Sequence, residues 1–186
     1  MTNELEKTWV GKALSKEELK QYASFEQGLK TRFTPSEKKS FEQAWAELVA
    51  QIAANLDKDP TSDFGVNIGK NCMDMINNLY GNEHANLRSA VWDKGFKAGK
   101  MDDNHGLSPE MVSWLDKAIE TFNRRRAYSI LSQLDTAPKL AQKLWDEFVT
   151  DMCGDSQTKK TELLQIAQAD GNIEKSAKNW LKKTYQ

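Results

Sequence analysis

Apolar residues recur every three or four positions along most of this chain, which is the spacing of an amphipathic helix. The clearest case follows Thr34, where Pro35 in the first turn and Glu37 three residues after the threonine predict a capped helix start. The apolar positions of this helix are Phe41, Ala44, Trp45, Leu48, Val49, Ile52, Ala53 and Leu56. No stretch alternates apolar and polar residues as a strand would. The pattern predicts an all-α protein.

Comparable signals predict the other helices. Ser15 and Glu18 have the spacing of a capping box, Gly81 suits the position that closes a helix, and Ser108 with Pro109 marks another start. No helix breaker lies between Pro109 and Leu134, so we expect one helix of about 26 residues there, joining two parts of the chain rigidly. The predicted helices cover residues 16–31, 35–56, 62–80, 82–97 and 109–134, with a loop at 100–106 and later helices around 140–152, 163–166 and 173–181.

An internal repeat organises this helical pattern. The stretch from Asn71 to Phe122 returns in a shortened form from Leu144 to Tyr185. An offset of 73 residues aligns Gly81 with Gly154, and an offset of 66 aligns the Trp114-Leu115 pair with its later copy, so the second copy has lost about seven residues from one loop. A repeated helical unit of this kind predicts two related parts of the fold.

Charge and composition narrow the classes of partner. The formal net charge is −1, so the chain lacks the basic field that binding to nucleic acid requires. The N-terminal residues contain no apolar signal segment, and no run of 18 apolar residues occurs, so we expect a cytoplasmic protein without a membrane partner. The two cysteines lack metal-site spacing and are expected to be reduced and buried.

The sequence contains no recognisable catalytic or metal-binding motif. His84 follows a helix start and His105 lies in a polar loop, and both are expected to be solvated or to cap helices. The absence of a phosphate-binding loop or an activated nucleophile indicates a protein that is not an enzyme and has no cofactor. The basic run from Arg124 to Arg126 has two interpretations, a solvated helix face or a patch for an anionic or acidic partner.

Aromatic residues are abundant for a helical protein of this size, with six tryptophans among 186 residues. A helical core explains most of them. The alternative interpretation is a concave pocket lined by a few aromatic rings, with sparse polar groups that orient a ligand.

Several short motifs occur in the order and spacing of a known family. They are Trp45-x-x-Leu48, Asp59-Pro60-x-Ser62, Leu79-Tyr80-Gly81-Asn82, Gly106-Leu107-Ser108-Pro109-Glu110-Met111, Trp114-Leu115 and Ala118. Together they make residues Ser15 to Phe122 resemble the antibiotic-recognition domain of thiostrepton-induced MerR-type regulators. The region from about Leu140 to Tyr185 looks like part of a second such unit, and a tandem of these units is similar to albicidin-binding resistance proteins.

This resemblance implies a globin-like helical fold without haem, in which a cleft between helices captures bulky aromatic peptide antibiotics. The chain departs from the family in three ways. It begins directly with the ligand-binding part, which favours a stand-alone binder over a transcription regulator. Asn86 stands at the position where the thiopeptide-binding member has an attacking cysteine, which favours reversible binding. Counterparts of the helices around Phe25 and Trp45 are missing from the second unit, so we expect that unit to be partial.

We therefore expect a full antibiotic-recognition unit over residues 1–125 and a partial second unit over 126–186. The predicted function is reversible sequestration of an albicidin-like antibiotic by a monomer or weak dimer, giving drug resistance. The alternative is a ligand-sensing or protein-interaction module. The predicted ligand-binding residues, taken from the region of the family's cleft, are Asn78, Tyr80, His84, Asn86, Trp92, Phe96, Trp114 and Trp145.

Overall fold

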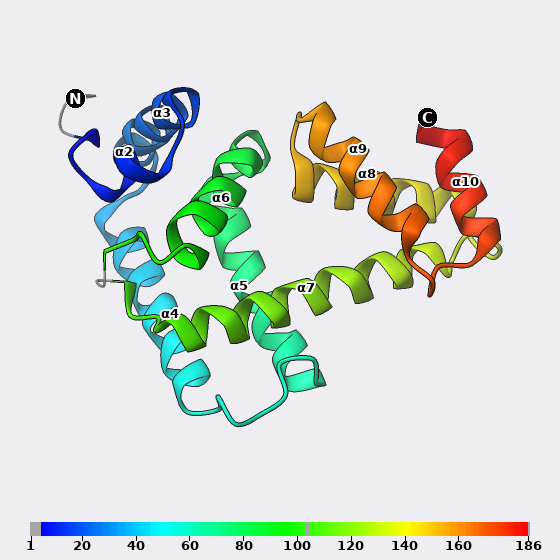
Figure 1. Cartoon of the computed structure of the whole chain (residues 1–186), viewed down its shortest axis with the longest axis horizontal. Helices are drawn as coiled ribbons and strands as arrows, with labels where there is room; N and C mark the ends of the chain where they lie inside the picture. Colours follow the sequence, from blue (N-terminus) through cyan, green and yellow to red (C-terminus); the bar gives the residue numbers. More distant parts are fainter. Residues whose placement is uncertain (1–4, 103–104, 186) are drawn as a thin grey trace. The chain divides into compact units, whose positions relative to one another are not determined.

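A computed structural model of the chain describes residues 5–102 and 105–185 and shows only helices there, joined by turns and loops (Figure 1). The all-α prediction is confirmed. The globin-like arrangement stays a prediction. The helical elements are α2 (Trp9–Ala13), α3 (Lys16–Arg32), α4 (Pro35–Ala53), α5 (Asp63–Tyr80), η1 (Asn82–His84), α6 (Ala85–Val91), η2 (Trp92–Lys97), α7 (Pro109–Leu131), α8 (Pro138–Cys153), α9 (Gln157–Ala169) and α10 (Lys175–Tyr185).

Side-chain caps fix where several helices begin, as the sequence predicts. Ser15 and Glu18 form a capping box before α3, and Thr34 and Glu37 form another before α4. The Ser62 hydroxyl accepts a hydrogen bond from the third residue of α5. The element α2 was not predicted, because five residues without a side-chain cap leave too short a pattern to recognise.

The segment predicted as one helix from Asn82 to Lys97 is a composite. It comprises a 3-10 turn, the α-helix α6 and the π-helix η2. A π-helix takes more residues per turn than an α-helix, and such a local change leaves little trace in a pattern of apolar residues. The loop predicted over residues 100–106 falls partly outside the described residues.

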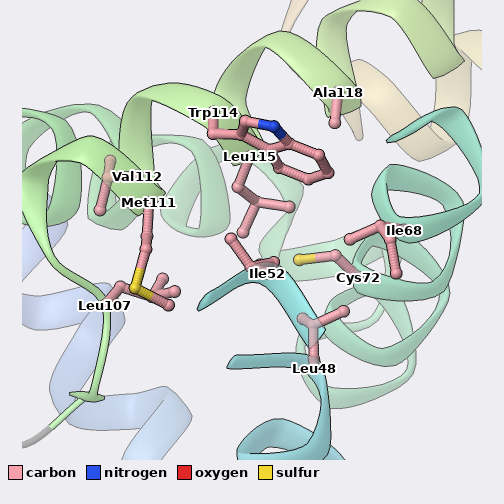
Figure 2. Packing of buried hydrophobic residues seen from close by; sticks show 10 residues of the cluster. All are labelled: Leu48, Ile52, Ile68, Cys72, Leu107, Met111, Val112, Trp114, Leu115 and Ala118. Atoms are coloured by element: carbon pink, nitrogen blue, oxygen red, sulfur yellow. The ribbon is translucent and has the colours of Figure 1, made fainter. Parts of the chain in front are cut away.

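The chain divides into two compact units, Met1–Phe122 and Asn123–Gln186. In the first unit, α4, α5 and α7 enclose one core (Figure 2), which consists of Leu48, Ile52, Ile68, Cys72, Leu107, Met111, Val112, Trp114, Leu115 and Ala118. Leu115 and Ile52, both fully buried, point toward each other there. A second core lies among α2, α3 and α6 and includes Phe25, Tyr80 and Leu87.

The second unit has a core of its own. It is built from α8, α9, α10 and the end of α7, and its buried members are Ile130, Leu131, Trp145, Phe148, Ala167, Ile173, Ala177 and Leu181. Within this unit Arg126 forms an ion pair with Asp151 at 2.7 Å and its guanidinium lies over the Phe148 ring, 5.3 Å from its centre. The arginine run is therefore not simply a solvated face, because at least Arg126 is a structural contact.

The internal repeat is visible in burial and backbone conformation. Gly81 and Gly154 follow equivalent helices and both have positive φ, 69° and 52°. At an offset of 73, the core position of Cys72 in α5 is occupied by Trp145 in α8, and each is almost fully buried. At an offset of 66, Leu115 of α7 corresponds to Leu181 of α10, both with no exposed surface. The two copies therefore bury equivalent side chains at these positions.

The end of α7 serves as the counterpart of α4, at an offset of 78 residues. After α4, the Asn55 amide nitrogen donates to the Ile52 carbonyl (3.0 Å), and after α7 Gln133 does the same to Ile130 (3.1 Å). The side-chain amides match too, because Asn55 Nδ2 donates to the carbonyl four residues earlier (2.7 Å) and Gln133 Nε2 does likewise (2.9 Å). The expectation that the second unit is partial stays a prediction, and the end of α7 shares these local contacts with the end of α4.

Candidate functional site

The π-helix η2 carries two of the predicted ligand-binding residues, Trp92 and Phe96. It is held from two sides. Lys94 Nζ lies 2.6 Å from a carboxylate oxygen of Glu18 on α3, and Lys97 Nζ lies 3.0 Å from Asp116 Oδ2 on α7. Because π-helical turns are less stable than α-helical ones, they persist where surrounding contacts hold them, and many are found at functional sites.

An aromatic cluster surrounds Phe96. The centre of its ring lies 5.2 Å from that of Trp92, 6.2 Å from that of Trp45 and 4.8 Å from that of His105. The Trp45 indole donates to the His105 carbonyl at 2.8 Å. The His105 side chain accepts a hydrogen bond from the Leu107 amide at 3.1 Å, so it orders the start of α7. The cluster packs against the core of the first unit and its rings are only partly exposed.

Asp116 connects this cluster with α7. Its Oδ1 accepts a hydrogen bond from the Trp92 indole at 2.8 Å, while Oδ2 pairs with Lys97. The hydrogen bond that Lys97 donates to Asp116 and the negative charges of Asp116 and Asp93 raise the pKa of Lys97, against the opposing effect of burial. The lysine therefore remains protonated beside the carboxylate of Asp116.

A hollow of about 530 Å³ lies beside Asp116. Its walls combine apolar and charged side chains, and they are formed by Leu56, Pro60, Glu110, Ser113, Trp114, Asp116 and Lys117. The predicted residue Trp114 lines this hollow but is only 7% exposed. Its indole donates to the Lys58 carbonyl at 2.8 Å, which fixes the ring against the loop that follows α4. Trp114 thus shapes a wall and offers little ring surface to a ligand.

Two other predicted residues, Tyr80 and His84, lie in the second core of the first unit. The Tyr80 ring is stacked on Phe25 with centres 4.4 Å apart, and His84 meets the same phenylalanine edge-on at 5.2 Å. Burial raises the pKa of Tyr80 to about 12, despite the nearby positive charge of Arg88. These rings stabilise the packing of α3 on α5, and none of them lines the hollow beside Asp116.

The two asparagines predicted to make polar contacts with a ligand differ in exposure. Asn78 is exposed on α5, whereas Asn86 is partly buried on α6. The side-chain oxygen of Asn86 is buried and accepts no hydrogen bond within the described part of the chain. An unsatisfied buried oxygen is unfavourable, and because this atom is buried it offers no acceptor at the protein surface.

Trp145 belongs to the second unit, whereas the other seven predicted residues belong to the first. It is 1% exposed, its ring centre lies 5.3 Å from that of Phe148, and its indole N–H finds no acceptor among the described residues. It is a core side chain at the repeat position of Cys72. A role in stacking on a ligand would need the second unit to open.

Comparison of the chain with family models, with curated proteins and with solved structures finds no match. The function is therefore argued from the geometry of this chain, and the resemblance to antibiotic-recognition domains stays a prediction.

Metal and thiol chemistry find little support in the described residues. No three histidine, cysteine or acidic side chains of residues 5–102 and 105–185 lie close enough together to hold a metal ion. Cys72 and Cys153 are both buried, as predicted, no disulfide joins them, and burial raises the pKa of Cys72 to about 12. A thiol with so high a pKa is a poor nucleophile at neutral pH. No helix in the same residues is long and apolar enough to cross a membrane.

Sequence reasoning missed most of the residues that line the hollow. The signal for Asp116 was weak, because an acidic residue on the polar side of a helix is ordinarily solvated. Its partner Trp92 lies 24 residues away on another element, so nothing local connects them. Lys117 and Glu110 were likewise indistinguishable from surface charges. Only the packing of α7 against the loop that follows α4 reveals that these groups surround one hollow.

Proposed function

We propose that the chain binds a bulky aromatic, peptide-like antibiotic reversibly and confers resistance by sequestering it. The observation that carries this proposal is the hollow beside Asp116 in the first unit. Trp114 forms part of its wall, and Asp116 accepts a hydrogen bond from Trp92 of the aromatic cluster on η2. The motifs that resemble antibiotic-recognition domains provide the ligand class, and the hollow provides a place for it.

The size of the hollow suits such a ligand. Its volume of about 530 Å³ falls within the range of roughly 300 to 1,000 Å³ that small-molecule sites occupy. Burial of apolar ligand surface there contributes roughly 25 cal/mol per Å², and the costs of ordering and association oppose this gain.

The chemistry of the walls supports an amphipathic ligand. Leu56, Pro60 and the edge of Trp114 offer apolar contacts, whereas Ser113 and Lys117 offer hydrogen-bond donors. A peptide-like compound presents both aromatic groups and amide or carboxylate oxygens. We expect its oxygens to lie near Lys117 and its ring to lie against Leu56 and Pro60.

Reversible binding is supported by the state of the cysteines. The thiol of Cys72 lies in the core and has a raised pKa, and Asn86 stands where the resemblance places an attacking cysteine. The hollow itself is lined by no cysteine. A ligand bound there is released unchanged.

The experiment titrates albicidin and a panel of aromatic peptide antibiotics into the protein and follows tryptophan fluorescence. Ser113 is exposed and lines the hollow, so Ser113→Phe fills it without disturbing the core. We expect saturable quenching in the unaltered protein and affinity reduced at least about tenfold in Ser113→Phe, which corresponds to a loss of about 1.4 kcal/mol.

The matched control is Asn179→Phe, which places the same ring at the equivalent exposed position of α10, 66 residues later. Equal loss of affinity in both variants would show that the introduced phenylalanine weakens binding by some means other than filling the hollow. A flat fluorescence response across the whole panel would contradict the proposal. Expression in a drug-sensitive host then measures whether binding protects the cell.

A protein-interaction module is the second candidate function. It is favoured by large apolar side chains that remain exposed in the second unit, Ile166 at 66% and Leu140 at 48%. An amphipathic helix of a partner would cover such residues. Retention of antibiotic binding in Ile166→Glu, with loss of a co-purifying protein, would assign the interaction to this unit.

A further inference from the structure

The second unit contains a hollow of its own, about 270 Å³ in volume. It lies between the end of α7 and the start of α10, and the residues that line it are Tyr128, Leu131, Ser132, Leu134, Asp135, Asn172, Ile173, Glu174, Ser176 and Ala177. None of these residues was predicted to bind a ligand. The hollow is independent of the site beside Asp116, because all of its residues belong to the second unit.

This hollow recurs at the position that the repeat predicts. Leu134 follows the end of α7 by three residues and Leu56 follows the end of α4 by three residues, and each lines the hollow of its own unit. Ser176 of α10 corresponds to Glu110 of α7 at the offset of 66, and these two also line the respective hollows. A space between these two helices is therefore a property of the repeated fold, which each copy lines with different side chains.

The floor of the second hollow is apolar. Leu131, Ile173 and Ala177 line it, and each is at most 8% exposed because it also belongs to the core. The Tyr128 ring forms part of the wall and its hydroxyl is fixed, donating to Asp170 Oδ2 at 2.6 Å and lying 3.3 Å from Asn172 Nδ2. An apolar floor with a fixed aromatic wall suits one small apolar or aromatic group.

The polar residues of this hollow give it a negative charge. Asp135 and Glu174 line it, and no lysine or arginine is among its lining residues. The partial positive charge at the start of α10 is offset by Glu174, which stands immediately before that helix. In the first hollow, by contrast, Lys117 and Glu110 both line the wall and Asp116 is paired with Lys97, so charges of both signs are present. The two hollows therefore favour ligands of different charge.

We propose that the second hollow binds a small organic ammonium ion that carries one apolar or aromatic group. The ammonium lies between the carboxylates of Asp135 and Glu174, and the apolar group occupies the floor beside Tyr128, whose ring face also attracts cations. A volume of about 270 Å³ is at the lower limit for a binding site, so it accommodates a ligand with about one ring.

The test uses phenethylamine as the probe and two-dimensional ¹H–¹⁵N NMR of the full chain as the readout. Uncharged 2-phenylethanol and anionic phenylacetate have a similar apolar part and serve as ligand controls. With the amine, we expect saturable chemical-shift changes of residues 128–135 and 172–177. The alcohol should bind with an apparent affinity at least about fivefold lower, and phenylacetate should cause no change. Equal binding of amine and alcohol would overturn the assignment of an ammonium site.

Variants separate the hollow from general surface charge. The double substitution Asp135→Asn with Glu174→Gln should weaken amine binding at least about fivefold, whereas Glu162→Gln on the exposed side of α9 should leave it unchanged. Ser132→Phe fills the hollow, and its matched control is Ala54→Phe, the same ring at the equivalent exposed position after α4. All five positions are exposed, so the variants are expected to fold, which the dispersion of the same spectra verifies.

Two outcomes would overturn the proposal. One is the absence of shifts at millimolar phenethylamine in the unaltered protein. The other is amine binding that survives both the double carboxamide substitution and Ser132→Phe, because it would place the amine outside this hollow.

Discussion

Asp116 makes more contacts at the site than its position on the polar side of α7 suggests. One carboxylate oxygen accepts from the Trp92 indole, the other pairs with Lys97, and the residue also lines the hollow. A single side chain thus fixes η2 on α7 and defines one wall for a ligand. Changes to its partners should therefore alter stability as well as binding.

Replacing Trp92 by phenylalanine tests this connection. Trp92→Phe keeps the ring against Phe96 but removes the indole donor to Asp116, so we expect the free energy of unfolding to fall by about 1.5 to 3 kcal/mol, as for hydrogen bonds to charged groups. Urea unfolding measures the change. Trp180→Phe in α10 is the control and should cost less than about 1 kcal/mol, because no hydrogen bond of its indole is among those described. Equal losses in both variants would contradict a role for the Asp116 bond.

Glu18 should give the first unit an acid-sensitive contact. Burial acts to raise the pKa of Glu18, but hydrogen bonds from Lys94 and from Ser15 outweigh it, and the pKa in the folded protein lies below the ordinary value of 4.5. The contribution to stability is therefore present above pH 4.5 and is lost as the pH falls through the pKa of the folded state.

Unfolding followed by circular dichroism between pH 6 and pH 3 measures this loss. Glu18→Gln should make the fall in stability shallower, whereas Glu17→Gln, at the exposed neighbouring position, should retain the slope of the unaltered protein. Identical slopes in Glu18→Gln and the unaltered protein would show that the Lys94 contact contributes nothing to the acid response.

Among the elements, the junction after α5 depends on a backbone conformation that only glycine adopts easily. Gly81 has φ of 69° and ψ of 171°, and a side chain added there would meet only the end of Glu83, no closer than 3.8 Å. Gly81→Ala should therefore destabilise the protein through backbone strain alone, by about 1 to 3 kcal/mol. Thermal unfolding measures it. Gly28→Ala inside α3, where no atom lies within 4 Å, should instead stabilise the protein by about 0.5 to 1 kcal/mol.

Element boundaries set by local chemistry could be predicted from the sequence. The caps at Ser15 and Thr34 and the glycines at 81 and 154 act within a few residues, and each forms as expected. The π-helical register of η2 could not be predicted, because it depends on Glu18 and Asp116, which reach it from other helices. For the same reason the sequence suggested aromatic residues for the site but not the charged residues of either hollow.

The tryptophans show the same limit. Trp114 and Trp145 were expected to stack on a ligand, yet Trp114 is fixed by the backbone carbonyl of Lys58 and Trp145 is buried in the core of the second unit. A pattern of apolar residues identifies which faces are buried, whereas a binding site depends on where that burial is incomplete. Incomplete burial is set by the fit between helices and is not encoded at any one position.

On the scale of the whole molecule, α7 contributes to two cores. Its first turns bury Met111 and Leu115 in the first unit, and its last turns bury Ile130 and Leu131 in the second. The boundary between the units, at Phe122 and Asn123, therefore lies inside one continuous helix.

Fragments of the chain should reveal this dependence. A fragment of residues 138–186 lacks Ile130 and Leu131, and losing two buried side chains removes about 3 to 6 kcal/mol, comparable with the whole stability of a small domain. We expect it to show little cooperative thermal unfolding by circular dichroism, whereas a fragment of residues 109–186, which restores α7, should unfold cooperatively. Cooperative unfolding of the shorter fragment would show that the core of the second unit does not require α7.

A shared helix also affects how many helices a further copy of the unit would require. When the closing helix of one copy opens the following copy, a further copy needs only three additional helical segments, equivalent to α8, α9 and α10, in place of four. Each gene duplication of that three-helix module would add another space between helices that mutation could line with new side chains. Extension by such a module would therefore give each added copy a space between helices of its own, as the two present copies have.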